Sequence, residues 1–291
     1  MIIGAHVSVS GGLVQAVEYA LSVGCECMQF FAKSPRQWRA KPVDTDVAAK
    51  FKAARAEVGF GPVFTHTAYL INLSTADDEL RAKSTAALAD ELQRAMILGA
   101  DAVVTHIGND KAGDDNAAAA RVGIAINEAF DASGARDSGV RLLLENSAGA
   151  GSIFGATFEQ LALCVDAVGL PSSHLGICLD TCHGFAQGME LDSEAGWRDC
   201  LDSIAGCCDL DRLGLIHAND CMFERGSRRD RHAWIGDGFI GMDGFSAMMC
   251  MPELHDVPLV TEMPGEVPEK DVVNNERLRA LREACAGSQS Q

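Results

Sequence analysis

Histidines and carboxylates close a series of short apolar runs along this chain. The closing residues of the eight runs are His6, Phe30, His66, His106, Glu145, Asp180, His217 and Glu262. Any one of them alone would more often be a hydrogen-bonded structural group. Brought together by one fold, so many imidazoles and carboxylates repel one another and lose hydration unless cations neutralise them. The joint pattern therefore predicts a metal centre.

Two loop segments add further donors at short spacing. His183 follows Asp180 by three residues, and His232 follows Asp230 by two. Imidazole and carboxylate donors without thiolates suit Zn²⁺ or Mn²⁺ better than Mg²⁺ or an iron–sulfur cluster. The nine candidate ligands are His66, His106, Glu145, Asp180, His183, His217, Asp230, His232 and Glu262. With one bridging carboxylate, nine groups suffice for three ions that keep positions open for water and substrate.

The eleven cysteines are irregularly spaced, and their odd number and lack of zinc-finger spacing favour reduced, mostly buried thiols over a disulfide framework. Cys178 and Cys182 flank the candidate metal centre. Their spacing across a strand end makes simultaneous binding of one ion unfavourable, so we expect both to be core thiols. His174 and His255 lie at the opposite ends of their elements, and we expect them to be surface or structural residues.

The chemistry depends on elements that gather these residues, and the chain alternates apolar runs with helical patterns. The expected strands cover 2–7, 25–31, 62–66, 102–106, 141–146, 174–180, 213–217 and 258–262. The expected helices cover 14–23, 46–57, 77–98, 116–132, a segment that begins with a capping box at Thr157, 194–207 and 269–284. A long loop at 220–243 takes the place of a helix after the seventh strand.

This alternation predicts an α/β fold, a parallel (β/α)₈ TIM barrel. In such a barrel the C-terminal ends of all eight strands meet at one mouth, which would bring the candidate ligands together. We expect a single domain over 1–286 and a disordered tail at 287–291. A doubly wound sheet is the rival architecture. The segment His6–Gly12 lacks the Gly-rich phosphate turn that would favour that sheet.

Composition limits the class of protein. The 291 residues are 47% hydrophobic and 22% charged, which is typical of a globular chain. The 24 basic and 41 acidic residues give a net charge of −17, which by itself argues against nucleic-acid binding. No apolar run approaches the ~18 residues of a membrane span, and no secretion signal opens the chain. We therefore expect no membrane contact and a cytoplasmic location.

Four stretches of sequence carry a family resemblance. They are 66–73 (HTAYLINL), 144–149 (LENSAG), 176–183 (GICLDTCH), and 217–220 with 226–232 (HAND and GSRRDRH). At these stretches, and from 4–8 through 29–31 and 36–39 to 261–262, the chain resembles the endonuclease IV family, zinc-dependent apurinic/apyrimidinic endonucleases also called deoxyribonuclease IV. The resemblance runs along the whole barrel.

The resemblance implies three zinc ions: one on His66, His106 and Glu145, a second on Glu145, Asp180, His217 and Glu262, and a third on His183, Asp230 and His232. It implies hydrolysis of the phosphodiester 5′ to an abasic site, giving a 3′-hydroxyl and a 5′-deoxyribose phosphate, and trimming of blocked 3′ ends. Glu145 is the implied catalytic residue. The implied DNA-binding residues are Arg36, Tyr69, Leu70, Arg228 and Arg231. The implied partner is double-stranded DNA that contains abasic sites or blocked 3′ ends, and we expect a monomer with no obligate protein partner.

Three positions depart from the family pattern: Ile107 replaces a proline, Ser74 replaces an alanine or glycine, and Met222 replaces a lysine, which puts one phosphate contact in doubt. The acidic charge is reconciled by the metal, because three Zn²⁺ bring −17 to −11 and concentrate positive charge at the mouth. Basic residues on the loops after strands two and seven, including Lys33, Arg36 and Arg225, are expected to face DNA.

Two alternatives remain open. A xylose-isomerase-like sugar isomerase or epimerase needs only one divalent metal, on Glu145, Asp180, His217 and Glu262, and leaves the other five ligands without a role. A metal-binding or damaged-DNA-binding protein without catalysis is the third interpretation, which metal-dependent turnover would exclude.

Overall fold

Eight parallel strands close into a barrel, which confirms the predicted fold class. The computed structural model describes residues 1–263, 265 and 269–288. The barrel strands are β1 (Ile3–His6), β2 (Cys27–Phe31), β3 (Val63–His66), β4 (Ala102–Thr105), β5 (Arg141–Glu145), β6 (Leu175–Asp180), β7 (Leu213–His217) and β10 (Leu259–Thr261). They follow one another around the barrel in chain order, and β1 pairs with β10 to close it.

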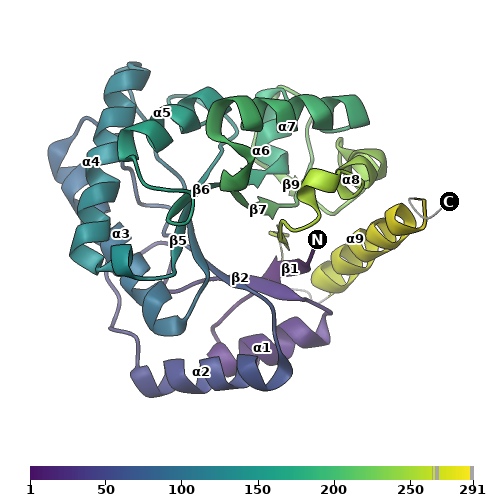
Figure 1. Ribbon diagram of the computed structural model, residues 1–291, viewed down its shortest axis with the longest axis horizontal. Coiled ribbons are helices and arrows are strands. Elements are labelled where there is room, and N and C mark those ends of the chain that lie inside the picture. The colour runs from purple at the N-terminus through teal and green to yellow at the C-terminus, as the bar shows by residue number, and fades with distance from the viewer. Residues whose placement is uncertain (264, 266–268, 289–291) are drawn as a thin grey trace.

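Helices surround the barrel on the outside (Figure 1). They are α1 (Leu13–Ser22), α2 (Thr45–Val58), α3 (Asp78–Leu98), α4 (Asp115–Ser133), α5 (Phe158–Val168), α6 (Thr181–Gln187), α7 (Glu194–Cys208), α8 (Gly241–Met249) and α9 (Glu269–Ser288). Short 3₁₀ turns cover Ala135–Asp137, Leu210–Arg212 and Pro252–Leu254. A two-stranded antiparallel pair, β8 (Asp220–Cys221) and β9 (His232–Ala233), stands apart from the barrel sheet.

Short polar side chains start most of the helices. Asp77 accepts a hydrogen bond from the Leu80 amide at the start of α3, and Thr157 accepts one from the Gln160 amide at the start of α5. These caps satisfy amides that have no partner inside the helix. The Gln160 side chain completes the α5 start by accepting from the amides of Gly155 and Ala156, a variation on the predicted capping box.

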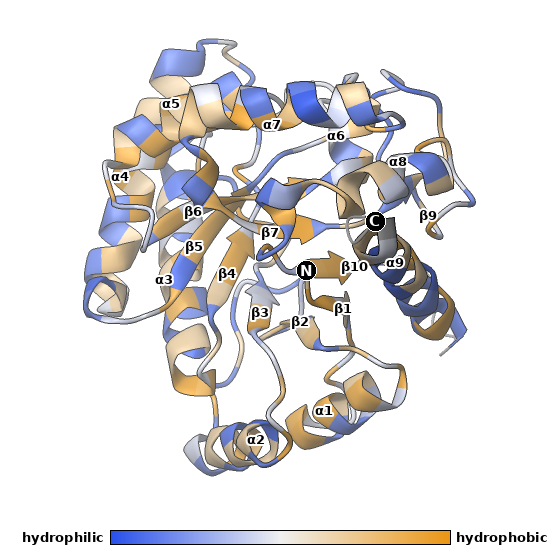
Figure 2. Ribbon diagram, turned by 45° about the vertical axis from the view of Figure 1, so that its right-hand side comes forward, coloured by the Kyte–Doolittle hydropathy of each residue, from blue (hydrophilic) through white to orange (hydrophobic). Residues whose placement is uncertain are grey.

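Two apolar clusters hold the barrel together. A small cluster fills its interior, from Cys27, Phe64, Ala102, Val104, Leu143, Cys178, Leu215 and Val260. The larger cluster lies between the strands and the surrounding helices. Figure 2 shows the result, with hydrophobic strands at the centre and helices whose hydrophilic residues alternate with hydrophobic ones. The closed, filled interior leaves the strand ends as the surface on which a site can be built.

Three sequence predictions about elements are wrong in detail. A helix does follow β7, because the predicted 220–243 loop contains the β8–β9 pair and leads into α8. The sequence predicted no helix between residues 180 and 194, yet α6 follows β6 at once, because Asp180 ends the strand and also caps the helix. Helix α9 continues through Ser288, beyond the predicted helix end at residue 284, while residues 289–291 of the predicted tail lie outside the described residues.

The cysteine prediction is confirmed for nine residues and wrong for two. Nine cysteines are free thiols, and eight of these are buried, Cys178 and Cys182 among them. Cys250 and Cys285 instead form a disulfide that joins the end of α8 to α9, because their Cα atoms lie 5.4 Å apart. None of the helices in the described part of the chain is long and apolar enough to cross a membrane.

Candidate metal centre

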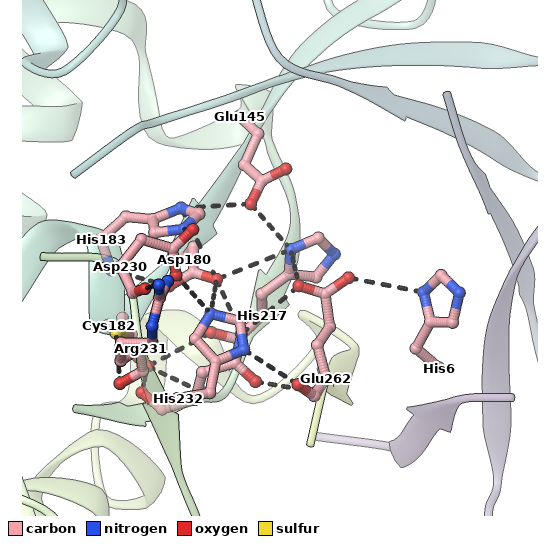
Figure 3. Close-up of polar contacts among 12 residues, drawn as sticks. His6, Glu145, Asp180, Cys182, His183, His217, Asp230, Arg231, His232 and Glu262 are labelled. Atoms are coloured by element: carbon pink, nitrogen blue, oxygen red, sulfur yellow. Dashed lines mark hydrogen bonds and ion pairs between the residues drawn. The ribbon is translucent and has the colours of Figure 1, made fainter. Parts of the chain in front are cut away.

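The nine predicted ligands meet at the C-terminal mouth of the barrel. Their donor atoms form three groups, each within 4.8 Å: His66, His106 and Glu145; Glu145, Asp180, His217 and Glu262; and His183, Asp230 and His232. A fourth group in the described part of the chain joins Asp180 and His232 to Cys182, which we had expected to be a core thiol. The fold therefore brings together five imidazoles and four carboxylates from segments far apart in sequence. Figure 3 shows Glu145, Asp180 and Glu262 directed at His217, with Asp230 and His232 beside them.

Strand ends position four of these nine side chains. His66, Glu145, Asp180 and His217 are the last residues of their strands, and Asp180 lies beside His217 in the register of β6 and β7. The four side chains are buried. Their positions are therefore set by the barrel ladder rather than by flexible loops.

Glu145 lies between two of the groups. Its Oε2 is 3.0 Å from His66 Nε2 and 3.6 Å from His106 Nδ1. Its Oε1 is 3.1 Å from His217 Nδ1 and 3.4 Å from His183 Nδ1. Each carboxylate oxygen thus faces a different set of imidazoles, which is the arrangement a bridging ligand requires.

Hydrogen bonds to carbonyl groups fix the protonation of three imidazoles. His66 Nδ1 donates to the Thr67 carbonyl, His183 Nδ1 to the Asn146 carbonyl and His232 Nδ1 to the Glu262 carbonyl. A carbonyl can only accept, so the hydrogen lies on that nitrogen and the lone pair of a neutral ring lies on the other. Metal-binding histidines are usually oriented in this way.

Gln29 completes this pattern, and sequence reasoning missed it. Its Oε1 accepts from His217 Nε2 at 2.9 Å, and its Nε2 donates to Glu262 Oε1 at 2.7 Å and lies 3.0 Å from His6 Nδ1. Gln29 is fully buried in the middle of β2. A polar residue at a buried strand position, one before the Phe30 expected to close the strand, was the available signal.

Asn219 is a second orienting residue that sequence reasoning did not assign a role. Its side-chain amide donates to Asp180 Oδ2 at 2.7 Å, and its Oδ1 accepts from the Glu262 amide at 2.8 Å. Asn219 is fully buried and lies two residues after His217. Through these hydrogen bonds its one side chain connects candidate ligands from different strands.

Burial and neighbouring charges act against each other at this centre. Burial raises the pKa of Glu145, but the imidazoles around it, first His106 and then His217, outweigh burial and hold that pKa well below its usual range. Burial raises the pKa of Asp180, and it lowers the pKa of His106 to about 4. The protein alone therefore leaves charges here that bound cations would balance.

The donor set fits a metal. Nε2 of His232 is buried and has no hydrogen-bond partner among the described residues, yet it lies 3.3 Å from Asp230 Oδ1 and 3.6 Å from Asp180 Oδ2. Burial lowers the pKa of His232, but these carboxylates outweigh burial and raise it to about 9. A nitrogen directed between carboxylates without a good hydrogen bond is what a ligand of an ion would present.

The loop that carries Asp230 and His232 is organised by Asp220. The two carboxylate oxygens of this buried residue accept hydrogen bonds from the backbone amides of Cys221, Gly236, Gly238, Ile240 and Gly241. The loop is also attached to α6, because the amides of Gly226 and Arg228 donate to the carbonyls of Phe185 and Ala186. Since α6 carries His183, this attachment fixes the position of His183 relative to Asp230 and His232, the other two members of the third group.

The five residues implied in DNA binding surround the mouth. Four of them, Arg36, Tyr69, Arg228 and Arg231, are exposed, and Leu70 is half-buried. Tyr69 is 62% exposed even though its ring contacts Phe31 and His66. With His66, His106 and Asp230, Tyr69 also lines a hollow of about 260 Å³ over the metal centre. None of the five is part of a metal-ligand group among the described residues.

Two basic residues that we expected to face DNA are engaged within the protein. The Lys33 side chain is fully buried beside Asp90, and Arg225 pairs with Glu190 and Asp192. Met222, which takes the place of a lysine, is exposed, and Ile107 is buried in the core. The basic surface at the mouth is thus smaller than the sequence predicted.

Comparisons with known proteins agree with this fold and show the family. The chain matches the family model of the xylose isomerase-like TIM barrel over residues 17–284. It is 41% identical to the probable endonuclease 4 of Methanoculleus marisnigri, over 97% of this chain and 99% of that protein. With the probable endonuclease 4 of Oleidesulfovibrio alaskensis the identity is 42%, over 98% and 95% of the two chains.

A solved structure is similar over the full length as well. Endonuclease IV from Thermus thermophilus superposes with a TM-score of 0.85 at 35% sequence identity, and the match covers 98% of this chain and 100% of that one. The fold and the comparisons define an enzyme built on a TIM barrel, with clustered donors at its mouth that could bind metal ions. The chain belongs to the endonuclease IV family.

Proposed function

We propose that this protein is a three-zinc DNA-repair endonuclease that cleaves the phosphodiester 5′ to abasic sites. The products are a 3′-hydroxyl and a 5′-deoxyribose phosphate, and blocked 3′ ends are trimmed by the same centre. The observation that carries the proposal is the position of Glu145, whose two oxygens face different groups of donors. Family membership supports the DNA substrate, since the relatives compared above bear the name endonuclease 4.

Three sets of residues would hold the zinc ions. His66, His106 and Glu145 form one set, Glu145, Asp180, His217 and Glu262 the second, and His183, Asp230 and His232 the third. When bound, the zinc ions supply an activated water nucleophile near neutral pH and positive charge for the oxygens of the phosphodiester. Donors of this type, with imidazoles oriented by second hydrogen bonds, favour zinc.

The protein's own residues then have separate tasks. Glu145 orients the attacking water, because its carboxylate is buried at the floor of the mouth and stays ionised, since the neighbouring imidazoles hold its pKa low. Gln29 and Asn219 keep His217, Asp180 and Glu262 in their ligand orientations. Water-excluding burial strengthens each of these electrostatic interactions.

Recognition of the lesion falls to the exposed residues at the rim. Tyr69 and Leu70 enter the duplex with Arg36 and occupy the space left by the extruded abasic nucleotide, while Arg228 and Arg231 contact phosphates. Extrusion costs less at an abasic site because no base is unstacked. All nine metal donors come from one chain, which supports a monomeric enzyme.

A sugar isomerase on the same barrel would use only the second set of donors. It leaves His183, Asp230 and His232 unused, although Asp220 fixes the loop that carries two of them. The nuclease proposal uses all three sets.

One experiment separates the two. The zinc-loaded protein is incubated with a duplex that holds a single stable abasic analogue, and separately with aldose and ketose sugars. We expect one cut on the 5′ side of the lesion with a free 3′-hydroxyl, lost after chelation and restored by Zn²⁺, and no sugar interconversion. Interconversion of a sugar without incision would overturn the proposal.

A further inference from the structure

Four charged residues lie behind the rim loops that carry Arg36 and Tyr69. They are Lys33 on the loop after β2 and Asp90, Glu91 and Arg94 on α3, and together they are called the α3 ion cluster below. None of them lines the hollow over the metal centre. None is a member of a metal-ligand group among the described residues.

The α3 ion cluster holds the loop after β2 at two points. At the start of the loop, Lys33 Nζ donates to Asp90 Oδ2 at 2.7 Å and lies 3.4 Å from Glu91 Oε1. At the end of the loop, Arg94 donates to the Lys41 carbonyl at 2.8 Å, and its Nε donates to Asp90 Oδ2 at 2.9 Å. Arg36 lies between these two attachments.

The same cluster holds the loop after β3. Glu91 Oε1 accepts a hydrogen bond from the Ala68 amide at 3.3 Å, directly before Tyr69. The two loops are also joined to each other, because the Tyr69 amide donates to the Pro35 carbonyl at 3.1 Å. One carboxylate oxygen of Glu91 therefore lies between Lys33 of the first loop and Ala68 of the second.

Burial makes the ion pair between Lys33 and Glu91 unusual. The side chains of Lys33 and Glu91 are 0% and 1% exposed, and Glu91 Oε2 has no hydrogen-bond partner among the described residues. Burying an ion pair costs desolvation energy that its attraction often does not recover, so such pairs are weak evidence for a stabilising role. What this pair does is fix the relative position of two exposed loops.

We propose that Lys33 and Glu91 are positioning residues for lesion recognition, which set the geometry of Arg36 and Tyr69 against the duplex. The inference rests on the proposed function, because it assigns these two loops to the abasic site. It predicts that the cluster governs the preference for abasic over undamaged DNA. Cleavage chemistry and metal binding depend on other residues.

The test uses paired substitutions at Glu91. Glu91→Gln keeps an oxygen that accepts from the Ala68 amide, whereas Glu91→Met has similar length and no acceptor. Lys33→Met is the partner variant, and Arg282→Met is the control, because it breaks an ion pair with Glu26 that is unconnected to the rim loops. Each zinc-loaded variant is checked for zinc content and thermal melting.

Two quantities are measured on each variant: the ratio of affinities for abasic and undamaged duplex by fluorescence anisotropy, and single-turnover rates for internal incision and for 3′-phosphate release. For Glu91→Met we expect the affinity ratio to fall roughly 10-fold or more, since a misplacement of about 1 Å can cost up to 10²-fold. The 3′-phosphate release rate and the zinc content should stay within about 2-fold. Glu91→Gln should keep most of the preference, and Arg282→Met all of it.

Several outcomes would overturn the inference. An unchanged affinity ratio in Glu91→Met would remove the positioning role. Equal losses in incision, 3′-phosphate release and zinc content would mean that the cluster only stabilises the fold. If Lys33→Met does not fold, the comparison of Glu91→Gln with Glu91→Met decides. Failure of the proposed function is a separate result, because the unmodified protein would then show no preference for abasic DNA.

Discussion

The metal donors and the rim residues are held in opposite ways. Glu145, Asp180 and His217 are buried at strand ends, so the closed ladder of the barrel fixes their positions. Arg36 and Tyr69 are exposed on loops, which depend on hydrogen bonds from outside the sheet. Under the proposed function, the fold itself positions the residues of the chemistry, whereas the residues of lesion recognition need additional supports.

Glu145→Gln is the strongest test of the role given to the buried donors at the strand ends. The substitution keeps the shape of the side chain and removes the charge that two donor groups share, so zinc content should fall by two ions per chain. Incision should fall by about 10³-fold or more, because loss of one electrostatic stabiliser alone costs roughly 10²–10³. Metal analysis and single-turnover incision measure the effects. Full zinc retention would contradict the bridging role, and Glu26→Gln at the N-terminal end of the barrel is the matched control.

Asp230→Asn tests whether a donor on a loop acts in chemistry as the strand-end donors do. Asp230 Oδ2 is 3.3 Å from His183 Nε2, and its Oδ1 is as close to His232 Nε2. We expect the single-turnover rate to fall roughly 10²–10³-fold, while affinity for abasic duplex changes much less. A rate equal to that of the unmodified protein would place the third group outside the mechanism.

Gln29→Leu sharpens the distinction between ligands and the residues that orient them. The change leaves His217 Nε2 without its acceptor and removes the hydrogen bond that Gln29 donates to Glu262 Oε1, while the apolar packing of β2 is kept. Zinc affinity should fall about 10–100-fold, as is typical when an orienting partner of a ligand is lost. Competition with a chelator measures it. Unaltered affinity would show that the strand ladder alone orients His217.

The double variant Arg36→Ala, Tyr69→Ala probes the recognition half of the comparison. Zinc content should be intact, because neither residue belongs to a donor group in the described part of the chain. Each lost contact is expected to weaken binding to abasic duplex by about 1–3 kcal/mol, by analogy with base–aromatic stacking. Release of 3′-phosphate should suffer less than internal incision, since a terminal nucleotide is easier to displace. Equal losses in both activities would indicate that Tyr69 only packs the rim against Phe31 and His66.

The sequence indicated which His, Asp and Glu side chains would lie together, because barrel geometry makes the ends of separate strands neighbours. Once an apolar run is recognised as a barrel strand, a His or carboxylate at its end is thereby located at the mouth, as His66 and His217 illustrate. The orienting residues were harder, since Gln29 is marked only by being polar inside a strand. Lys33 was placed in the wrong environment because its acidic partner Asp90 is 57 residues away and on another element.

Elements outside the ladder were also less predictable. The loop after β7 contains a run of Arg, Gly and Asp, and its order comes from five amides that converge on Asp220, a tertiary arrangement without a local pattern. The Cys250–Cys285 disulfide depends on how α8 meets α9. Both features follow from contacts between segments that sequence periodicity does not report.

Zinc stoichiometry tests the central claim most directly. The protein, purified without chelators or added metal, is analysed for all transition metals by mass spectrometry, together with a His232→Asn variant prepared in parallel. The three donor groups predict about three zinc ions per chain in the unmodified protein and about two in the variant. A single ion per chain in both proteins, with full activity restored by Mn²⁺ alone, would contradict the three-zinc account and favour a one-metal enzyme of the isomerase type.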